Sequence, residues 1–508
     1  MRAPPLRQMG LMGCGIRVSR GPSPAARSRA GRTLRQLVPP APAQFGSSLR
    51  QSHQVACLGP ARQATASEIN MAFSDTTFVN LSIFMLLLAS SVSAQSSFRP
   101  PALVLPVRKD ASTLQYVTKI NQRTPSVSLN LVLDLGGQFL WVDCDKNYIS
   151  CTYRPVRCRS AQCSLAGNDG CGNCTNGPKP GCNTNTCVVF PDNTVTHTAT
   201  GGEVAQDSLI VASTDGSNPG RSVTVPQFIF GCGSTFLLKG LASGTVGMAG
   251  LGRARIGLPS QLSAAFSFHK KFVICLSTSY TVDGVVFFGD DPYNFLPNVE
   301  AAGFLQYTPL FINPVSTAGI SSQGEPSDEY FIGVKSIRVG DKAVKLNNTL
   351  LTIDRQGNGG TKISTVNPYT VLETSIFKAV TNAFISEAAA RNISRVAGVA
   401  PFEVCFSSEN VLGTRLGASV PYIELVLQGQ NVVWTITGSN SMVYVNDNVL
   451  CLGFVDGGLN PRTSIVIGGY QLEDLLLQFD LATSRLGFTS TLLGAQTTCS
   501  NFKFTSTA

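Results

Sequence analysis

Short apolar stretches separated by turn-forming residues run along most of this chain, a pattern typical of strands. Around residues 127–133, Val127, Leu129, Leu131 and Leu133 alternate with smaller or polar residues. This is the period of a strand with one buried face. Similar apolar runs recur at 209–211, 228–230, 272–276, 285–288, 423–427, 432–436 and 475–479, with Gly, Pro, Asn and Asp between them. The pattern predicts an all-β fold with a few short helices.

The clearest helical pattern covers residues 374–391. Ile376, Phe377, Val380 and Phe384 fall on one face of a helix there, and Thr374 or Ser375 can cap its first turn. A shorter helix is expected to begin at residues 258–262, where a proline stands in the first turn.

Two turns in the predicted strands have the same layout. In residues 131–144 an apolar strand runs into Asp134, Gly136 and Gly137 turn the chain, and a second apolar strand follows. In residues 359–372 the corresponding position is Ser364, which lies 230 residues after Asp134. Each turn is followed by an apolar strand that ends in glycine, at 248–252 and at 465–469. A single Asp-x-Gly is most often a surface turn, but its repetition predicts two related lobes.

The two turns resemble the active-site loops of pepsin-like aspartic proteases, where each strand ends in Asp-Thr-Gly or Asp-Ser-Gly. Leu135 stands at the place of the first hydroxyl residue, and Ser364, Thr365 and Val366 stand at the second loop. The resemblance implies a bilobal fold without an intact catalytic pair, because proteolysis needs two carboxylates that share a proton. Asp134 then becomes a vestigial turn residue, which we expect to titrate near its ordinary value. The substrate-covering hairpin is expected near residues 196–203, without a tyrosine.

The N-terminal part of the chain differs in composition from the rest. Residues 1–70 hold ten arginines and one acid, a surplus that equals the formal net charge of +9. They carry no sustained apolar period, so we interpret them as a disordered extension upstream of the true start at Met71. Basic tails that bind nucleic acid and transit peptides are the alternatives.

Residues 71–94 have the apolar core and small-residue end of a secretory signal peptide, with cleavage after Ala94.

The mature chain, residues 95–508, is nearly neutral, which gives no reason to expect a nucleic-acid or membrane partner. Secretion favours disulfides over a zinc site, and no metal or cofactor is expected. Three glycosylation triplets begin at Asn173, Asn347 and Asn392. The mature chain holds thirteen cysteines, an odd number, so one of them is expected to have no partner. Twelve are predicted to form disulfides: Cys144, Cys158, Cys163, Cys171, Cys174, Cys182, Cys187, Cys232, Cys275, Cys405, Cys451 and Cys499.

A narrower resemblance covers the whole mature chain. The stretches that carry it are 98–101 (FRPP), 201–204 (GGEV), 247–252 (GMAGLG), 258–261 (LPSQ), 333–337 (GVKSI), 438–442 (GSNSM) and 471–474 (QLED). They are similar to the plant extracellular dermal glycoprotein and its relatives, the xylanase inhibitors and basic seed globulins. The resemblance implies an N-terminal lobe at 95–312, a C-terminal lobe at 328–508 and a protease-like region at about 116–489. It also singles out Cys151, in a polar loop, as the unpaired cysteine.

For function, this resemblance implies a monomeric, secreted plant-defence protein of the cell wall that is not an enzyme. Its partners would be microbial endo-β-1,4-glucanases, xyloglucanases or xylanases, which it would inhibit. An aspartic endopeptidase with altered chemistry and a storage or hormone-binding globulin are the alternatives.

The resembling inhibitors contact their enzymes through loops of the C-terminal lobe, and two stretches match these loops. Arg415 lies between glycines in residues 413–417, and Gln496 lies in residues 494–499. A glycosidase cleft presents two carboxylates ~5–9 Å apart, and arginine pairs bidentately with carboxylate. A solvated surface arginine is the plain alternative for Arg415. We therefore predict Arg415 and Gln496 as inhibitory contact residues.

Overall fold

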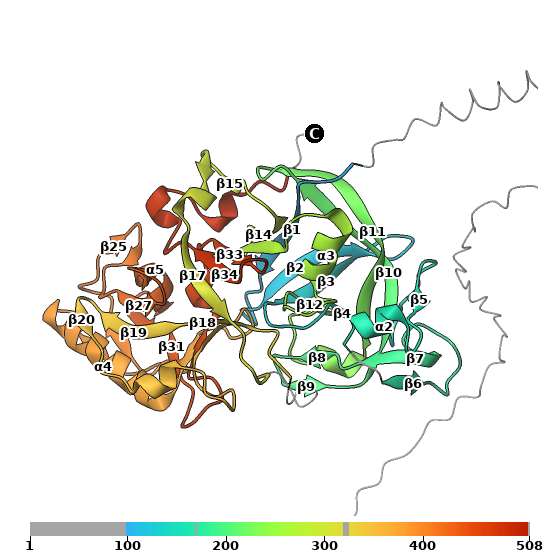
Figure 1. Cartoon of the computed structure of the whole chain (residues 1–508). Coiled ribbons are helices and arrows are strands. Elements are labelled where there is room, and N and C mark those ends of the chain that lie inside the picture. The colour runs from blue at the N-terminus through green and yellow to red at the C-terminus, as the bar shows by residue number, and fades with distance from the viewer. Residues whose placement is uncertain (1–97, 168–169, 318–324, 506–508) are drawn as a thin grey trace, which may run out of the picture. The chain divides into compact units, whose positions relative to one another are not determined.

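The computed structural model describes residues 98–167, 170–317 and 325–505 (Figure 1). All of them belong to one compact unit, Ser67–Ala508. The predicted extension 1–70 and the predicted signal peptide 71–94 lie outside the described residues.

The N-terminal lobe is built mainly from antiparallel strands. Strand β1 pairs with β2, β10 and β14, while β10 and β11 form the longest hairpin. The main strands of this lobe are β1 (Ala102–Lys109), β2 (Tyr116–Gln122), β3 (Val127–Asp134), β4 (Trp141–Asp143), β10 (Gly202–Thr214), β11 (Pro219–Gly233), β12 (Gly247–Gly250), β13 (Lys271–Cys275) and β14 (Gly284–Gly289). In β3 the predicted alternation merges into a fully buried end, Leu131 to Asp134.

The C-terminal lobe repeats the central motif of the first. Strands β21 (Thr361–Ile363) and β32 (Ile465–Ile467) pair in parallel, as β3 and β12 do in the first lobe. Around them lie β18 (Tyr330–Ile332), β22 (Thr370–Leu372) and β31 (Phe454–Asp456). Two four-stranded sheets complete the lobe: β19 (Val334–Val339) with β20 (Lys342–Ala343), β27 (Ile423–Leu427) and β28 (Val433–Ile436), and β23 (Arg395–Val396) with β24 (Cys405–Ser407), β29 (Met442–Asn446) and β30 (Val449–Leu452).

Strands from the end of the chain join the two lobes. Strand β33 (Leu477–Asp480) pairs with β13, and β34 (Arg485–Phe488) pairs with β17 (Gln306–Phe311), so both lie between the lobes in Figure 1. Phe272 of β13 stacks on Phe479 of β33 with ring centroids 4.8 Å apart. Tyr330 packs against Phe479 and donates to the Leu251 carbonyl at 2.7 Å. The hydrophobic core is therefore continuous across the junction. The predicted all-β, two-lobed class is confirmed.

Helices are few and cover the sheets from outside. Helix α3 (Leu258–Phe266) begins where predicted, with proline in its first turn. Helix α4 (Thr374–Ala390) also matches its prediction, but neither Thr374 nor Ser375 is its cap. Glu373 caps it instead, because its carboxylate accepts the Ser375 amide at 2.8 Å and the Ile376 amide at 3.2 Å. Helices α2 (Ala161–Leu165) and α5 (Gly438–Ser441) are single turns. No helix in these described ranges is long and apolar enough to cross a membrane.

Disulfides concentrate in the N-terminal lobe, and the twelve cysteines predicted to pair do so. The bonds are Cys144–Cys232, Cys158–Cys171, Cys163–Cys187, Cys174–Cys182, Cys275–Cys499 and Cys405–Cys451. The prediction that Cys151 is unpaired is wrong, because Cys151 is also disulfide-bonded. The odd number of cysteines in residues 95–508 does not show which of them lacks a partner within that segment, and Cys151 is half-buried rather than isolated.

One hydroxyl group joins the two symmetric loops. Thr365, 1% exposed, accepts a hydrogen bond from the Leu135 amide at 3.0 Å and donates one to the Leu133 carbonyl at 2.8 Å. Leu135 has no hydroxyl with which to make the reciprocal pair of bonds. The direct hydrogen bonding found between the loops is therefore one-sided.

We predict that Thr365→Val destabilises the folded protein by ~1–3 kcal/mol, because it leaves a buried amide and a buried carbonyl without a partner. Urea unfolding followed by tryptophan fluorescence measures this change. Thr352→Val is the matched control, since Thr352 is exposed and bonds only within its own turn, to the Thr349 carbonyl at 3.1 Å. Equal midpoints for the two variants would contradict the role given to Thr365.

Candidate functional site

The first loop holds Asp134 at the end of a buried strand. Gly250 of β12 is the register partner of Asp134, and the Leu251 amide donates to the Asp134 carbonyl at 2.8 Å. The turn depends on Gly137, because a Cβ there would lie 2.9 Å from the Asp134 carboxylate and 3.1 Å from the Gly250 backbone. Close packing of the loop against β12 therefore fixes where the carboxylate points.

The second loop is held in the same way as the first. The Gly252 amide bonds the Gly137 carbonyl at 2.8 Å, and in the second lobe the Gly469 amide bonds the Asn367 carbonyl, also at 2.8 Å. Ser364 follows β21 directly, and its hydroxyl accepts from the Val366 amide at 3.2 Å and the Asn367 amide at 3.3 Å. The Ser364 side chain is thus used to hold the turn of its own loop.

Asp134 is a buried carboxyl group, only 5% exposed. Its Oδ2 accepts from the Thr194 hydroxyl at 2.7 Å and its Oδ1 from the Gly136 amide at 3.0 Å. Burial raises the pKa of Asp134 from 3.8 to about 6, and the charges of Glu329 and Asp192 act in the same direction. The expectation of near-normal titration was wrong, because the loss of a partner carboxylate does not remove the cost of burying a charge.

A short hairpin closes over Asp134. It consists of β8 (Asp192–Asn193) and β9 (Thr198–Ala199), so it begins earlier than the predicted span 196–203. The buried Asn193 amide bonds the Leu237 and Lys239 carbonyls, and the Trp141 indole donates to the Asp192 carbonyl at 2.9 Å. These bonds fix the hairpin, and Thr194 at its turn reaches the carboxylate.

The hairpin leaves little space at Asp134. The cavity there has a volume of about 30 Å³, room for one or two water molecules. The hairpin residue Thr194, which the sequence did not single out, therefore helps to close the region in which a protease binds its substrate.

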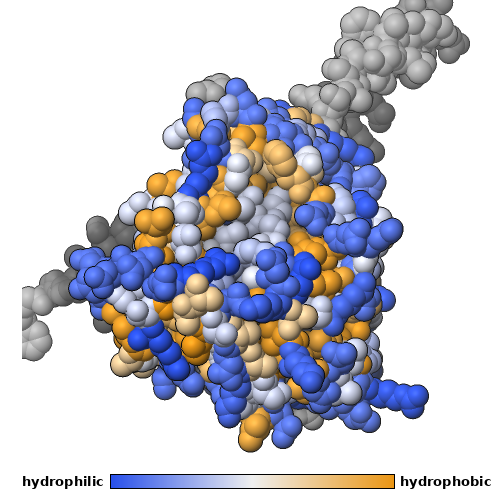
Figure 2. Space-filling view, turned by 90° about the vertical axis from the view of Figure 1, so that its left-hand side faces the viewer, coloured by the Kyte–Doolittle hydropathy of each residue, from blue (hydrophilic) through white to orange (hydrophobic). Residues whose placement is uncertain are grey.

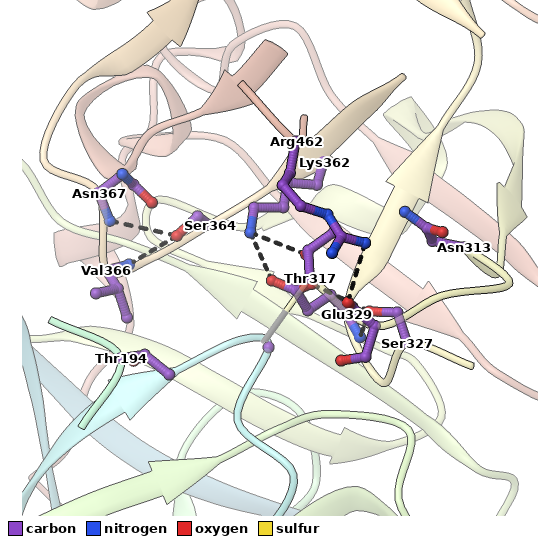
Figure 3. A network of polar contacts seen from close by, with 12 residues as sticks. Thr194, Asn313, Thr317, Ser327, Glu329, Lys362, Ser364, Val366, Asn367 and Arg462 are labelled. Atoms are coloured by element: carbon purple, nitrogen blue, oxygen red, sulfur yellow. Dashed lines mark hydrogen bonds and ion pairs between the residues drawn. The ribbon is translucent and has the colours of Figure 1, made fainter. Parts of the chain in front are cut away.

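A second carboxylate lies next to the first loop but is neutralised. A Cβ at Gly136 would lie 2.9 Å from Cγ of Glu329, so Glu329 packs directly on the loop. The Lys362 ammonium pairs with Glu329 at 2.6 Å, and Thr317 and Ser327 donate to its other oxygen (Figure 3). Burial alone would raise its pKa, but the Lys362 charge and these hydrogen bonds lower the pKa of Glu329 below its ordinary value. Sequence reasoning missed this cluster, since its members are distant along the chain.

The two predicted contact residues, Arg415 and Gln496, lie side by side. Arg415 and Leu416 form the tip of a two-residue hairpin between β25 (Gly413–Thr414) and β26 (Gly417–Ala418). With its carboxamide oxygen facing the guanidinium, Gln496 accepts hydrogen bonds from Arg415 Nη1 at 2.7 Å and Nη2 at 3.2 Å. Both side chains are exposed. The sequence suggested each position separately but gave no sign of this contact.

The hairpin that carries Arg415 is anchored to α5. The Ser439 amide donates to the Leu416 carbonyl at 2.8 Å. Gly417 has φ +86°, and a Cβ there would lie 2.1 Å from the Ser439 amide nitrogen, so glycine is required for this approach. Among the described residues, no ion pair involves Arg415. The guanidinium is therefore positioned, exposed and without an acidic partner.

The predicted glycosylation positions are sterically accessible. Asn173, Asn347 and Asn392 all have exposed side chains. Asn392 also adopts a left-handed backbone with φ 58°, directly after α4. Glycosylation at the three positions remains a prediction.

The raised pKa of Asp134 predicts a pH-dependent effect of Asp134→Asn. Ionisation of Asp134 costs folding free energy, and this cost is absent below about pH 4 and fully present above about pH 6. Asp134→Asn should therefore be more favourable, relative to the unaltered chain, at pH 7 than at pH 4, by ~2–3 kcal/mol. Urea unfolding at both pH values measures this difference. Asp447→Asn, at an exposed position, is the control, and an equal effect of Asp134→Asn at both pH values would contradict the assignment.

Comparison with known proteins places both lobes in one family. The model for the xylanase inhibitor N-terminal domain matches residues 116–290, and that for the xylanase inhibitor C-terminal domain matches residues 329–490. The chain is 66% identical over 427 residues to the probable aspartic proteinase GIP2 of Nicotiana benthamiana, covering 83% of this chain and 97% of that one. It is 42% identical over 433 residues to gamma conglutin 1 of Prunus dulcis, covering 84% and 95%.

Solved structures agree with this placement. The crystal structure of edgp has 70% sequence identity and a TM-score of 0.80, covering 81% of this chain and 100% of that one. The crystal structure of basic 7S globulin from soybean has 36% identity and a TM-score of 0.70, covering 80% and 100%. The chain therefore belongs to the xylanase-inhibitor family, which is related to the pepsin-like aspartic proteases and includes the extracellular dermal glycoprotein.

Proposed function

We propose that the protein is a secreted inhibitor of microbial cell-wall glycoside hydrolases, namely endo-β-1,4-glucanases, xyloglucanases or xylanases, and that it has no protease activity. The observation that carries the proposal is Arg415, an exposed arginine without an acidic partner at the tip of an anchored hairpin. The names of the two matching family models point to the same class of partner.

The chemistry of the partner fits a guanidinium. Most glycoside hydrolases carry two carboxyl groups ~5–9 Å apart in an open cleft. A guanidinium can pair with one of them through two parallel hydrogen bonds, and exclusion of water by the surrounding surfaces strengthens this pair. Insertion of Arg415 would therefore both block the cleft and engage its catalytic charge.

The surroundings of Arg415 suit an interface. Leu412 is 76% exposed, and Leu416 stands beside Arg415 at the hairpin tip. Figure 2 looks onto the end of the C-terminal lobe that carries β20 and β25, where hydrophobic residues lie between hydrophilic ones. Exposed apolar residues next to an arginine anchor are common in interfaces.

Gln496 lowers the entropy that Arg415 must lose on binding. Its carboxamide and the Ser439–Leu416 hydrogen bond restrict the guanidinium and the hairpin before an enzyme arrives. Such preorganisation raises affinity, because ordering a long side chain otherwise costs ~0.5–1.5 kcal/mol. Gln496 thus acts on the enzyme partly through Arg415.

The absence of proteolysis is supported by the two loops. The similar hydrogen bonds of the two loops support taking Ser364 as the counterpart of Asp134, and a hydroxyl group cannot share a proton as a second carboxylate would. Glu329 cannot substitute, since Lys362 pairs with it. The fixed hairpin over Asp134 also restricts access of a peptide.

Secretion is supported by the disulfides and by the exposed glycosylation positions. Six bonds among the described residues, together with the bonded Cys151, fit an oxidising compartment. The proposal therefore places the protein outside the cell, where it meets microbial glycosidases in the cell wall.

We predict that Arg415→Ala weakens inhibition of a sensitive glucanase or xylanase by ~2 kcal/mol or more, about a 30-fold rise in the inhibition constant. The inhibition constant of Arg415→Lys should lie between those of the unaltered chain and Arg415→Ala, because lysine keeps the charge and loses the bidentate geometry. Inhibition constants against a panel of fungal enzymes measure both. Arg355→Ala, at an exposed loop position of the same lobe, is the control. If Arg415→Ala inhibits every sensitive enzyme as well as the unaltered chain does, the binding edge lies elsewhere.

We also predict that the purified protein does not cleave unfolded protein at about pH 4, where a working dyad would share one proton. Release of fluorescent peptides from labelled casein, with and without pepstatin, measures this activity. Pepstatin-sensitive cleavage that disappears in Asp134→Asn would contradict the prediction, whereas cleavage that persists in Asp134→Asn comes from a contaminant.

A further inference from the structure

The small cavity beside Asp134 has walls of an unusual composition. Asp134 and Asp192 line it together with Phe139, Trp141, Phe190 and Met248. Trp141 and Met248 are buried, and Phe190 is 43% exposed. The cavity therefore reaches the surface beside Phe190 and ends at a buried carboxylate.

The buried carboxylate has no positive partner. Among the described residues no ion pair involves Asp134, and its two hydrogen bonds come from uncharged donors, the Thr194 hydroxyl and the Gly136 amide. The charged groups that face it from neighbouring elements are Asp192 on the hairpin and Glu329 at the start of β18. Lys362, a cation of the cluster in Figure 3, pairs with Glu329. Among these described residues, the Asp134 carboxylate is therefore contacted by neutral donors and by no cation.

We propose that this cavity is a binding site for a primary ammonium group, carried either by a small free amine or by a lysine side chain of a peptide. A cation there would satisfy the buried Asp134 carboxylate, whose charge otherwise lies in a poorly hydrated place. Aromatic side chains on the wall add an attraction for cations. A metal ion is a poorer match, because the described residues hold no group of three ligating side chains.

The dimensions set the size of the group. A volume of about 30 Å³ accommodates an ammonium group with about one attached carbon and excludes a quaternary ammonium group. A longer amine would extend past Phe190 toward the surface. The site is separate from the Arg415 hairpin, so its failure would leave the proposed inhibition untouched.

The test is a titration of the purified protein with ¹³C-methylammonium chloride, followed by NMR saturation transfer, at about pH 7.5, above the pKa of Asp134. We expect saturable binding that is at least tenfold weaker in Asp134→Asn and unchanged in Asp447→Asn, which removes an equal charge at an exposed position. Sodium chloride at matched concentration corrects for ionic strength. Tetramethylammonium should not compete, because it is too large for the cavity.

A second measurement needs no variant. The binding of methylammonium by the unaltered chain should fall at least tenfold between about pH 7.5 and about pH 4.5, because protonation of Asp134 removes the charge. N-acetyl-lysine methylamide as competitor identifies the source. Competition assigns the site to peptide lysines as well, its absence assigns the site to free amines, and both results support an ammonium site. Absence of saturable binding, or equal binding by Asp134→Asn, would overturn the proposal.

Discussion

The hydrogen bonds of the Thr365 hydroxyl to the backbone of residues 133 and 135 tie the two symmetric loops of this molecule together. The loops lie at the ends of the paired strands β3/β12 and β21/β32, so a shift between them would disturb both lobe cores. Since Leu135 offers no hydroxyl, Thr365 makes this link without a reciprocal bond. Aromatic packing of Phe272, Tyr330 and Phe479 supports the same junction.

The side chains of the two loops and their neighbours determine the chemistry at the junction. Asp134 is buried in the first loop, whereas Ser364 of the second loop carries no charge and holds its own turn. The additional carboxylate, Glu329, is neutralised by Lys362. A pinned hairpin then closes the cavity through Thr194. Arg415, at an exposed hairpin of the C-terminal lobe, is in contrast a positioned cation without an ion-pair partner among the described residues.

Local sequence patterns predicted the strands, the two loops and the Arg415 turn, but they missed the features that depend on contacts between residues far apart in the chain. The two loops could be found because Gly137 and the glycines after β12 and β32 stand where a Cβ would clash with neighbouring atoms. Arg415 could be placed on a turn because Gly417 follows it. The pKa of Asp134, its bond to Thr194 and the Glu329–Lys362 pair depend on residues far apart in the chain, for which one sequence holds no signal.

Two smaller errors have the same origin. The sequence favours Thr374 or Ser375 as the cap of α4, because both have typical capping side chains. In the structure Glu373, just before the helix, accepts the free amides of its first turn. Parity, a polar surrounding and the family resemblance single out Cys151 as a free thiol, but none of them reports where a partner sulfur lies. Choices among several equivalent side chains need the three-dimensional arrangement.

The central claim is that this scaffold meets a glycosidase through the Arg415 edge of the C-terminal lobe rather than through its closed cleft. Hydrogen–deuterium exchange of the protein with and without a saturating fungal endoglucanase tests it most directly. The account predicts that protection on binding concentrates at residues 412–418 and 493–498, with little change at 190–200. Protection centred on the hairpin at 190–200, with unchanged exchange at 412–418, would contradict it.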